Sequence, residues 1–118
     1  MRLITAVVGY VVTMDTVDHS APFRLSIAED GTVVAGGEVD MAVGPELEAL
    51  VMPLVRQRSV VIDLSAVSFL DSSGLRSLLR IAQIADEHGT DLVVRSPSPE
   101  VGRLFELTGT RDRFTIEV

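Results

Sequence analysis

Two adjacent serines stand at the predicted start of a helix, where a hydroxyl could take part in phosphate chemistry. Asp71, Ser72, Ser73 and Gly74 follow an apolar run and precede an amphipathic segment. The first turn of a helix presents unpaired backbone N–H groups and favours negative charge, so a phosphate is accommodated there. A structural role fits the same residues, with Asp71 as N-cap and the serines as polar first-turn residues. Spacing alone favours the structural role, because such cap signals are common.

As a hydrolytic nucleophile, Ser72 lacks the residues that this chemistry needs. No Gly-x-Ser-x-Gly elbow surrounds it, and a catalytic triad requires a histidine base. The chain has two histidines, and His19 lies in a predicted connector. His88 lies at the opposite end of the predicted helix, roughly 24 Å away at the standard rise per residue. The sequence therefore predicts no catalytic residues and no enzymatic activity.

Metal and cofactor sites are not predicted either. Asp15 and Asp18 lie near His19, but no second histidine stands at ligand spacing, so a solvated acidic loop is expected. The absence of cysteine excludes disulfides and thiolate ligands. Gly36-Gly37 fits neither the P-loop nor the dinucleotide fingerprint, and we expect a turn or a β-bulge there, at a strand end.

The segments around the serines alternate between strand and helix patterns, which predicts an α/β domain with a mixed sheet. The expected strands are a hairpin at 23–28 and 32–35, a buried strand at 59–64 followed by a short loop, and strands at 92–94 and 114–118. The expected helices are 45–55, kinked or split at Pro53, then 72–87 closed by His88-Gly89, and 100–107.

Composition indicates one folded, acidic domain. The chain has 118 residues, 47% of them hydrophobic, and a formal charge of −7. An acidic chain lacks the electrostatic footprint of a nucleic-acid binder, so direct binding of DNA or RNA is not expected. The apolar stretch Leu3–Val12 is far shorter than the ~20 residues that span a bilayer, and no clear signal-peptide cleavage site follows it. We therefore expect a cytoplasmic protein without a membrane span.

Three segments carry a wider pattern: Gly36–Asp40, Val61–Leu75 and Ser98–Gly109. Together, and in this order, they resemble the STAS family, whose best-known members are bacterial anti-sigma factor antagonists. The resemblance covers residues 23–118 and implies a single STAS-type domain. The implied fold is a mixed sheet of four to five strands with helices packed mainly on one face. Residues 1–22 remain as an N-terminal extension, either an extra strand or a flexible arm.

The resemblance also implies a function and a partner. It identifies Ser72 as a phosphorylation site, and the partner as an anti-sigma factor with serine kinase activity. Binding of that partner would free a sigma factor, phosphorylation would end the binding, and a serine phosphatase would restore it. Mg-ATP would be used by the partner kinase, so the chain itself needs no cofactor. A monomer or weak dimer is expected.

The residues expected to contact the partner lie around Ser72: Asp40, Asp71, Ser73, Gly74 and Arg76. Asp40 is expected to orient Ser72 or contact the kinase, and a plain cap role fits it equally well. The chain also departs from the family pattern in two places. Val43-Gly44 stand where many antagonists carry Thr-Ala, so a hydroxyl cap is absent, and Arg76 stands where some members have glycine. An alternative function is a STAS scaffold that is never phosphorylated, in a stress-signalling assembly or a lipid-transport machine.

Overall fold

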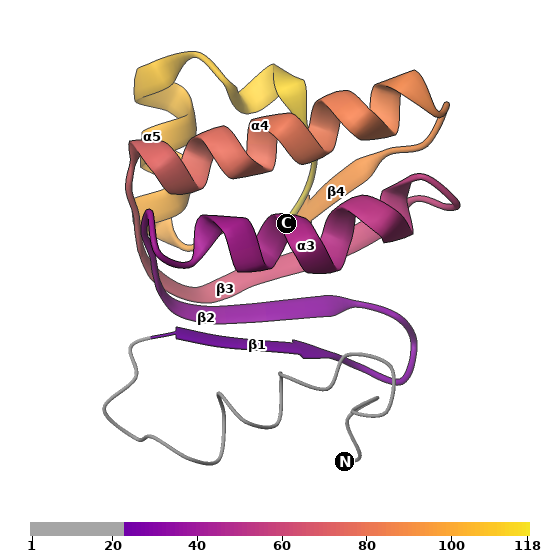
Figure 1. Cartoon of the computed structure of the whole chain (residues 1–118). Coiled ribbons are helices and arrows are strands. Elements are labelled where there is room, and N and C mark those ends of the chain that lie inside the picture. The colour runs from indigo at the N-terminus through magenta and orange to yellow at the C-terminus, as the bar shows by residue number, and fades with distance from the viewer. Residues whose placement is uncertain (1–22) are drawn as a thin grey trace.

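A five-stranded mixed sheet organises residues 23–118, the part of the chain that the computed structural model describes (Figure 1). The elements are β1 (Phe23–Ile27), β2 (Val33–Val39), α3 (Gly44–Val55), β3 (Val60–Leu70), α4 (Ser72–Glu87), β4 (Leu92–Arg95), α5 (Pro99–Thr108), a short 3₁₀ helix η1 (Arg111–Arg113) and β5 (Thr115–Glu117). The strand order is β1-β2-β3-β4-β5; β1 is antiparallel to β2, and the other neighbouring pairs are parallel. The predicted α/β class and mixed sheet are confirmed.

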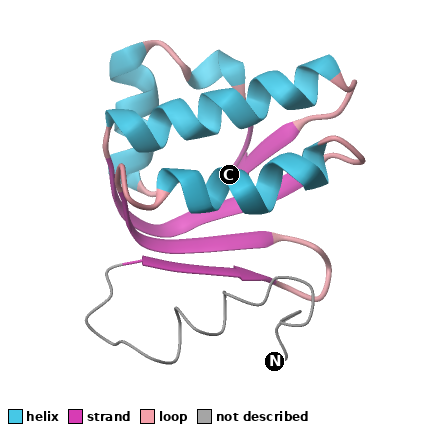
Figure 2. Cartoon of the chain, viewed as in Figure 1, coloured by secondary structure: helices cyan, strands magenta, loops and turns pink. Residues whose placement is uncertain are grey.

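The helices gather on one side of the sheet, as expected (Figure 2). Alternation along β1 shows which face they cover, because Phe23, Leu25 and Ile27 are buried while Arg24 is exposed. Burying each such large apolar side chain stabilises the fold by about 1.5–3 kcal/mol. No helix within residues 23–118 is long and apolar enough to cross a membrane.

The glycine pair Gly36-Gly37 produces irregular pairing inside β2 rather than ending the strand. The register between β2 and β3 shifts between Val34 and Gly36 and again between Gly37 and Glu38. Gly37 has φ of 89°, a conformation that glycine adopts without steric cost. The irregular pairing agrees with the expected turn or bulge at this pair, whereas the predicted end of the strand at residue 35 is wrong, since β2 continues to Val39.

The central strand β3 is also longer than expected. We predicted a strand ending at residue 64 and then a loop, but β3 continues to Leu70. Its second half pairs with β2, so that Ala66 lies opposite Gly36 and Leu70 opposite Val39. Asp71 alone separates β3 from α4. The serines therefore follow directly from the carboxyl end of a central strand, which holds them on a rigid element.

Helices α3 and α4 lie side by side over the sheet (Figure 1). Pro53 does not split α3, contrary to the expectation, because it falls in the last turn and the helix ends at Val55. The predicted start of α4 at Ser72 and its end at His88-Gly89 are confirmed. Its buried stripe is formed by Leu75, Leu78, Ile81, Ala82 and Ala85.

The third helix, α5, is fixed to the sheet by a serine at its start. Ser98 Oγ donates a hydrogen bond to the Val67 carbonyl at 2.6 Å and accepts one from the Val101 N–H at 3.4 Å. At the other end of α5, the rings of Phe105 and Phe114 pack with centroids 5.0 Å apart. These contacts join the C-terminal part of the domain to the same core.

Candidate functional site

The start of α4 treats its two serines differently. Asp71 has an extended backbone, and its Oδ1 accepts hydrogen bonds from the Gly74 N–H at 2.8 Å and from Ser73 Oγ at 2.7 Å. The predicted N-cap role of Asp71 is therefore confirmed. Ser72 is exposed, and within residues 23–118 its hydroxyl has no hydrogen-bond partner. A free hydroxyl at a helix start is accessible to a modifying enzyme.

Hydrogen bonds keep the Asp71 carboxylate ionised. The Ser73 hydroxyl, and after it the Gly74 N–H, hold the pKa of Asp71 below the ordinary value for aspartate. Burial opposes this shift, and the backbone N–H groups of Ser73 and Met41 add smaller lowering contributions to the pKa of Asp71. Met41 lies in the loop between β2 and α3, so this loop contributes to the electrostatics of the start of α4.

Asp40 caps the turn before α3. Its Oδ1 accepts from the Ala42 N–H at 2.9 Å and from the Val43 N–H at 3.3 Å. Val43, the N-cap of α3, makes no side-chain cap bond, and the bonds to Asp40 fix the turn that leads into the helix. The structure gives no hydrogen bond between Asp40 and Ser72, so the expected orienting role is not seen. Contact of Asp40 with a partner stays a prediction.

Gly74 lets α4 approach the ends of two strands. A Cβ atom at this position would lie 2.7 Å from the Val39 carbonyl oxygen and 2.7 Å from Leu70 Cδ1. Gly74 is buried, so its visible role is internal packing. A contact with the partner, expected from the sequence, stays a prediction for Gly74 as it does for the neighbouring Ser73.

A polar link joins α3 to α4 just behind the serines, and the sequence did not reveal it. Ser77 Oγ donates to Glu48 Oε2 at 2.6 Å, and Arg80 pairs with Glu48 Oε1 at 3.5 Å. The helices meet closely here, since a Cβ on Gly44 would lie 2.5 Å from Ser77 Oγ. A cleft of about 130 Å³ remains between the helices. Its lining includes Ser73 and Arg76.

Two exposed apolar side chains lie in the segments before α3 and α4, and sequence patterns did not single them out. Met41, in the β2–α3 loop, is 71% exposed, and Phe69, three residues before Ser72, is 49% exposed. Arg76 is exposed one turn after Ser72. A surface that combines apolar, hydroxyl and guanidinium groups suits protein–protein contact.

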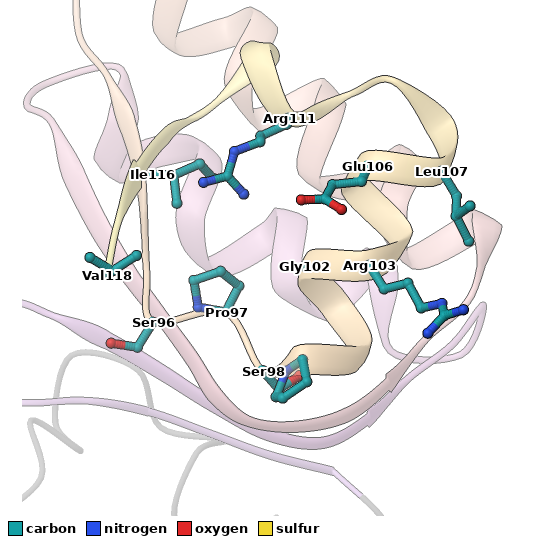
Figure 3. A pocket seen from close by; sticks show the side chains of 11 residues that line it. Ser96, Pro97, Ser98, Gly102, Arg103, Glu106, Leu107, Arg111, Ile116 and Val118 are labelled. Atoms are coloured by element: carbon teal, nitrogen blue, oxygen red, sulfur yellow. The ribbon is translucent and has the colours of Figure 1, made fainter.

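A wider cleft lies elsewhere, between α5 and β5. It measures about 800 Å³, and Pro97, Gly102, Ile116 and Val118 form part of its wall. Arg111 and Glu106 point into it (Figure 3). The cleft holds none of the residues singled out from the sequence around Ser72, and its charged lining consists of Arg103, Arg111 and Glu106.

Among residues 23–118, the structure places no histidine beside Ser72. His88 ends α4 at the far side from Ser72, and its Nδ1 lies 2.9 Å from the Ile84 carbonyl oxygen. Within residues 23–118, no three histidine or acidic side chains gather as a metal site. His19, Asp15 and Asp18 lie outside the described residues, as does the expected extra strand or arm of residues 1–22, so those expectations stay predictions.

Comparison with known proteins decides the family. The STAS domain model matches residues 25–118. The chain belongs to the STAS domain family. The anti-sigma-B factor antagonist of Staphylococcus aureus (strain NCTC 8325 / PS 47) is 34% identical to this STAS domain over 82 residues, which cover 68% of this chain and 76% of that protein. The chain is therefore placed with the anti-sigma factor antagonists of the family.

Solved structures show the same fold. An anti-sigma factor antagonist from Mycobacterium paratuberculosis matches with a TM-score of 0.63 and 34% identity, covering 80% of this chain and 85% of that chain. Unphosphorylated SpoIIAA, an anti-sigma factor antagonist, matches with a TM-score of 0.60 at 24% identity, covering 81% of this chain and 88% of that one. The phosphorylated form of SpoIIAA, a Bacillus cell fate determinant, matches with a TM-score of 0.56 at 23% identity, and the match covers 81% of this chain and 91% of that chain.

Proposed function

We propose that this STAS domain binds an anti-sigma factor with serine kinase activity, so that a sigma factor is released, and that phosphorylation of Ser72 ends the binding. The observation that carries the proposal is the free, exposed Ser72 hydroxyl on the first turn of α4, beside a serine whose hydroxyl is already bonded. The relatives named antagonists of an anti-sigma factor support the choice of partner. The chain performs no chemistry of its own in this scheme.

Ser72 suits phosphorylation better than Ser73. The Ser73 hydroxyl donates to Asp71, and a phosphate there would replace this donor with a group that repels the Asp71 carboxylate. Ser72 has no such bond to lose. A phosphate on Ser72 would lie where the α4 dipole favours negative charge, so the domain would stay folded.

The effect of the phosphate is expected at the interface. Phosphorylation adds nearly two negative charges at pH 7. If the docked partner covers Ser72, the new charge must be desolvated and placed beside partner groups that fit a neutral hydroxyl, which costs several kcal/mol. Binding would then be lost while both proteins stay folded, and a cytoplasmic serine phosphatase would restore it.

The proposal is tested by intact-mass spectrometry with site mapping. The purified chain is incubated with Mg-ATP and, one at a time, with the anti-sigma factor kinases of its source organism. One added phosphate on wild type and on Ser73→Ala, absent from Ser72→Ala, is the expected result. Phosphate on Ser73, or no phosphate from any kinase, would overturn the proposal; a kinase-independent stable partner would then favour the unphosphorylated scaffold.

A further inference from the structure

We infer that the outer surface of α4 recognises a partner surface that carries carboxylates beside an apolar patch. The inference rests on the proposed function and adds the chemistry of the partner's contact surface. It concerns Ser72, Arg76 and Arg80, here called the α4 ridge, together with the exposed apolar side chains of Met41 and Phe69.

The α4 ridge is one continuous strip. Ser72, Arg76 and Arg80 follow one another at steps of four residues on a single helix, and all three are exposed. Residues four apart are neighbours on a helix surface. A flat partner surface that covers Ser72 therefore also meets Arg76, and with one further turn it meets Arg80.

The ridge is positive on a chain whose formal charge is −7. Arg76 takes part in no ion pair within residues 23–118. Arg80 pairs with Glu48, yet its side chain stays 56% exposed against 17% for Glu48, so the positive group faces outward. A docked partner must therefore satisfy at least the Arg76 guanidinium, and carboxylates are its natural acceptors.

The acidic groups nearby are engaged within the domain, and Glu48 is bound to Arg80 and to Ser77 Oγ. Asp71 and Asp40 both turn their carboxylates onto backbone N–H groups of their own turns. Glu38 is exposed, but it lies on β2, opposite Phe69 in the register with β3. Within residues 23–118, Arg76 is thus the ridge arginine without an ion pair, and Glu38 places a negative charge at the end of β2.

Apolar area adjoins the ridge. Met41 and Phe69 are two of the four large apolar side chains that are strongly exposed in residues 23–118. Met41 lines the same cleft as Arg76 and Arg80, and Phe69 lies near the end of β3. The Met41 N–H interacts with the Asp71 carboxylate, and Phe69 is three residues from Ser72 in the chain. Methionine, aromatic residues and arginine are the types enriched at protein interfaces.

This charge pattern gives the phosphate a specific target. A partner carboxylate that pairs with Arg76 would lie close to the hydroxyl of Ser72. A phosphate on Ser72 would then repel that carboxylate, and it would also compete with the carboxylate for Arg76. Both effects would weaken the contact between Arg76 and the partner.

The test measures the affinity of Arg76→Gln, Arg76→Glu and Arg80→Glu for each purified anti-sigma factor kinase of the source organism. Arg103→Glu is the matched control, because Arg103 is an exposed arginine on α5 that forms no ion pair in the described part of the chain. We expect Arg76→Glu to weaken binding at least about tenfold and Arg103→Glu to leave it unchanged. Raising salt from about 50 to about 300 mM should weaken wild type more than Arg76→Gln.

The outcomes separate the inference from the function on which it rests. If a kinase binds wild type and Arg76→Glu equally well, the acidic partner surface is refuted and the proposed function stands. If Arg103→Glu weakens binding as much as Arg76→Glu, only the net charge of the chain matters, and the inference is again refuted. If no kinase binds wild type, the proposed function fails, and the inference fails with it.

Discussion

The Ser73 hydroxyl donates a hydrogen bond to Asp71 Oδ1 at 2.7 Å, within the cap that starts α4. This bond engages the hydroxyl of Ser73. The hydroxyl of Ser72 is exposed and has no hydrogen-bond partner within residues 23–118. The two adjacent serines therefore have different roles. Ser73 belongs to the structure of the helix start, and Ser72 is available to another protein.

Substitution of the two serines should affect stability differently. Ser73→Ala removes the donor to a carboxylate and should lower the free energy of unfolding by about 1 kcal/mol. Ser72→Ala removes no bond seen in the structure and should change it by less than about 0.5 kcal/mol. Urea unfolding of both variants measures the difference, and equal losses would contradict the assignment of the bonded hydroxyl to Ser73.

Removal of the Asp71 side chain should destabilise the domain through the helix start. Asp71→Ala leaves the Gly74 N–H and the Ser73 hydroxyl without their acceptor, and a loss of about 1 kcal/mol is expected. Asp86→Ala, an exposed aspartate near the other end of α4, serves as the control and should change stability by less than about 0.5 kcal/mol. A similar loss in both variants would refute the capping role.

The same carboxylate predicts how stability depends on pH. Hydrogen bonds from Ser73 and Gly74 lower the pKa of Asp71 in the folded protein. Because the pKa of Asp71 is lower in the folded than in the unfolded protein, the ionised carboxylate stabilises the fold. This stabilisation is complete above the pKa of the unfolded protein, about 3.9, and is lost as pH falls through the pKa of the folded protein. Wild type should therefore exceed Asp71→Asn in stability at pH 6, and the gap should shrink below pH ~4.

Unfolding measured from pH 6 down to pH 3 tests this, with Asp86→Asn to account for the loss of one carboxylate elsewhere on α4. A gap between wild type and Asp71→Asn that stays constant, or that widens with acid, would contradict the cap as the source of the shift.

Two helix glycines should respond oppositely to alanine. A Cβ at Gly74 would lie 2.7 Å from the Val39 carbonyl oxygen, so Gly74→Ala should cost about 1–3 kcal/mol. At Gly102 in α5 a Cβ meets nothing within 4 Å, so Gly102→Ala should stabilise by about 0.5–1 kcal/mol. Thermal unfolding of both variants checks the pair, and a tolerated Gly74→Ala would mean that α4 can shift away from Val39.

Local patterns in the sequence were sufficient for the element types and for the start of α4. Strand alternation at residues 23–27, the helical stripe from Leu75 to Ala85 and the Asp71 cap all depend on near neighbours in the chain. The second half of β3 was not predictable in this way. Its residues 65–69 are mostly exposed and do not alternate, and it is held as a strand by pairing with the irregular end of β2.

Contacts between distant segments account for what the sequence did not reveal at the site. The link from Ser77 to Glu48 spans 29 positions and exists only because α3 and α4 pack together. The exposure of Met41 and Phe69 likewise follows from where β2 and β3 end. For Asp40 the sequence allows a cap role or a role toward Ser72 and the kinase, and the structure shows the turn-capping bonds to the Ala42 and Val43 N–H groups.

The most direct test of the central claim is the dissociation constant of the anti-sigma factor kinase for this STAS domain with and without phosphate on Ser72. Phosphoserine introduced at position 72 during synthesis gives a uniform sample, and Ser72→Ala is the uncharged control. We predict that the kinase binds wild type and Ser72→Ala alike and binds the phosphorylated protein about a hundredfold more weakly, a difference of roughly 2.7 kcal/mol. Equal affinity for the phosphorylated and unphosphorylated proteins, both folded, would contradict the account.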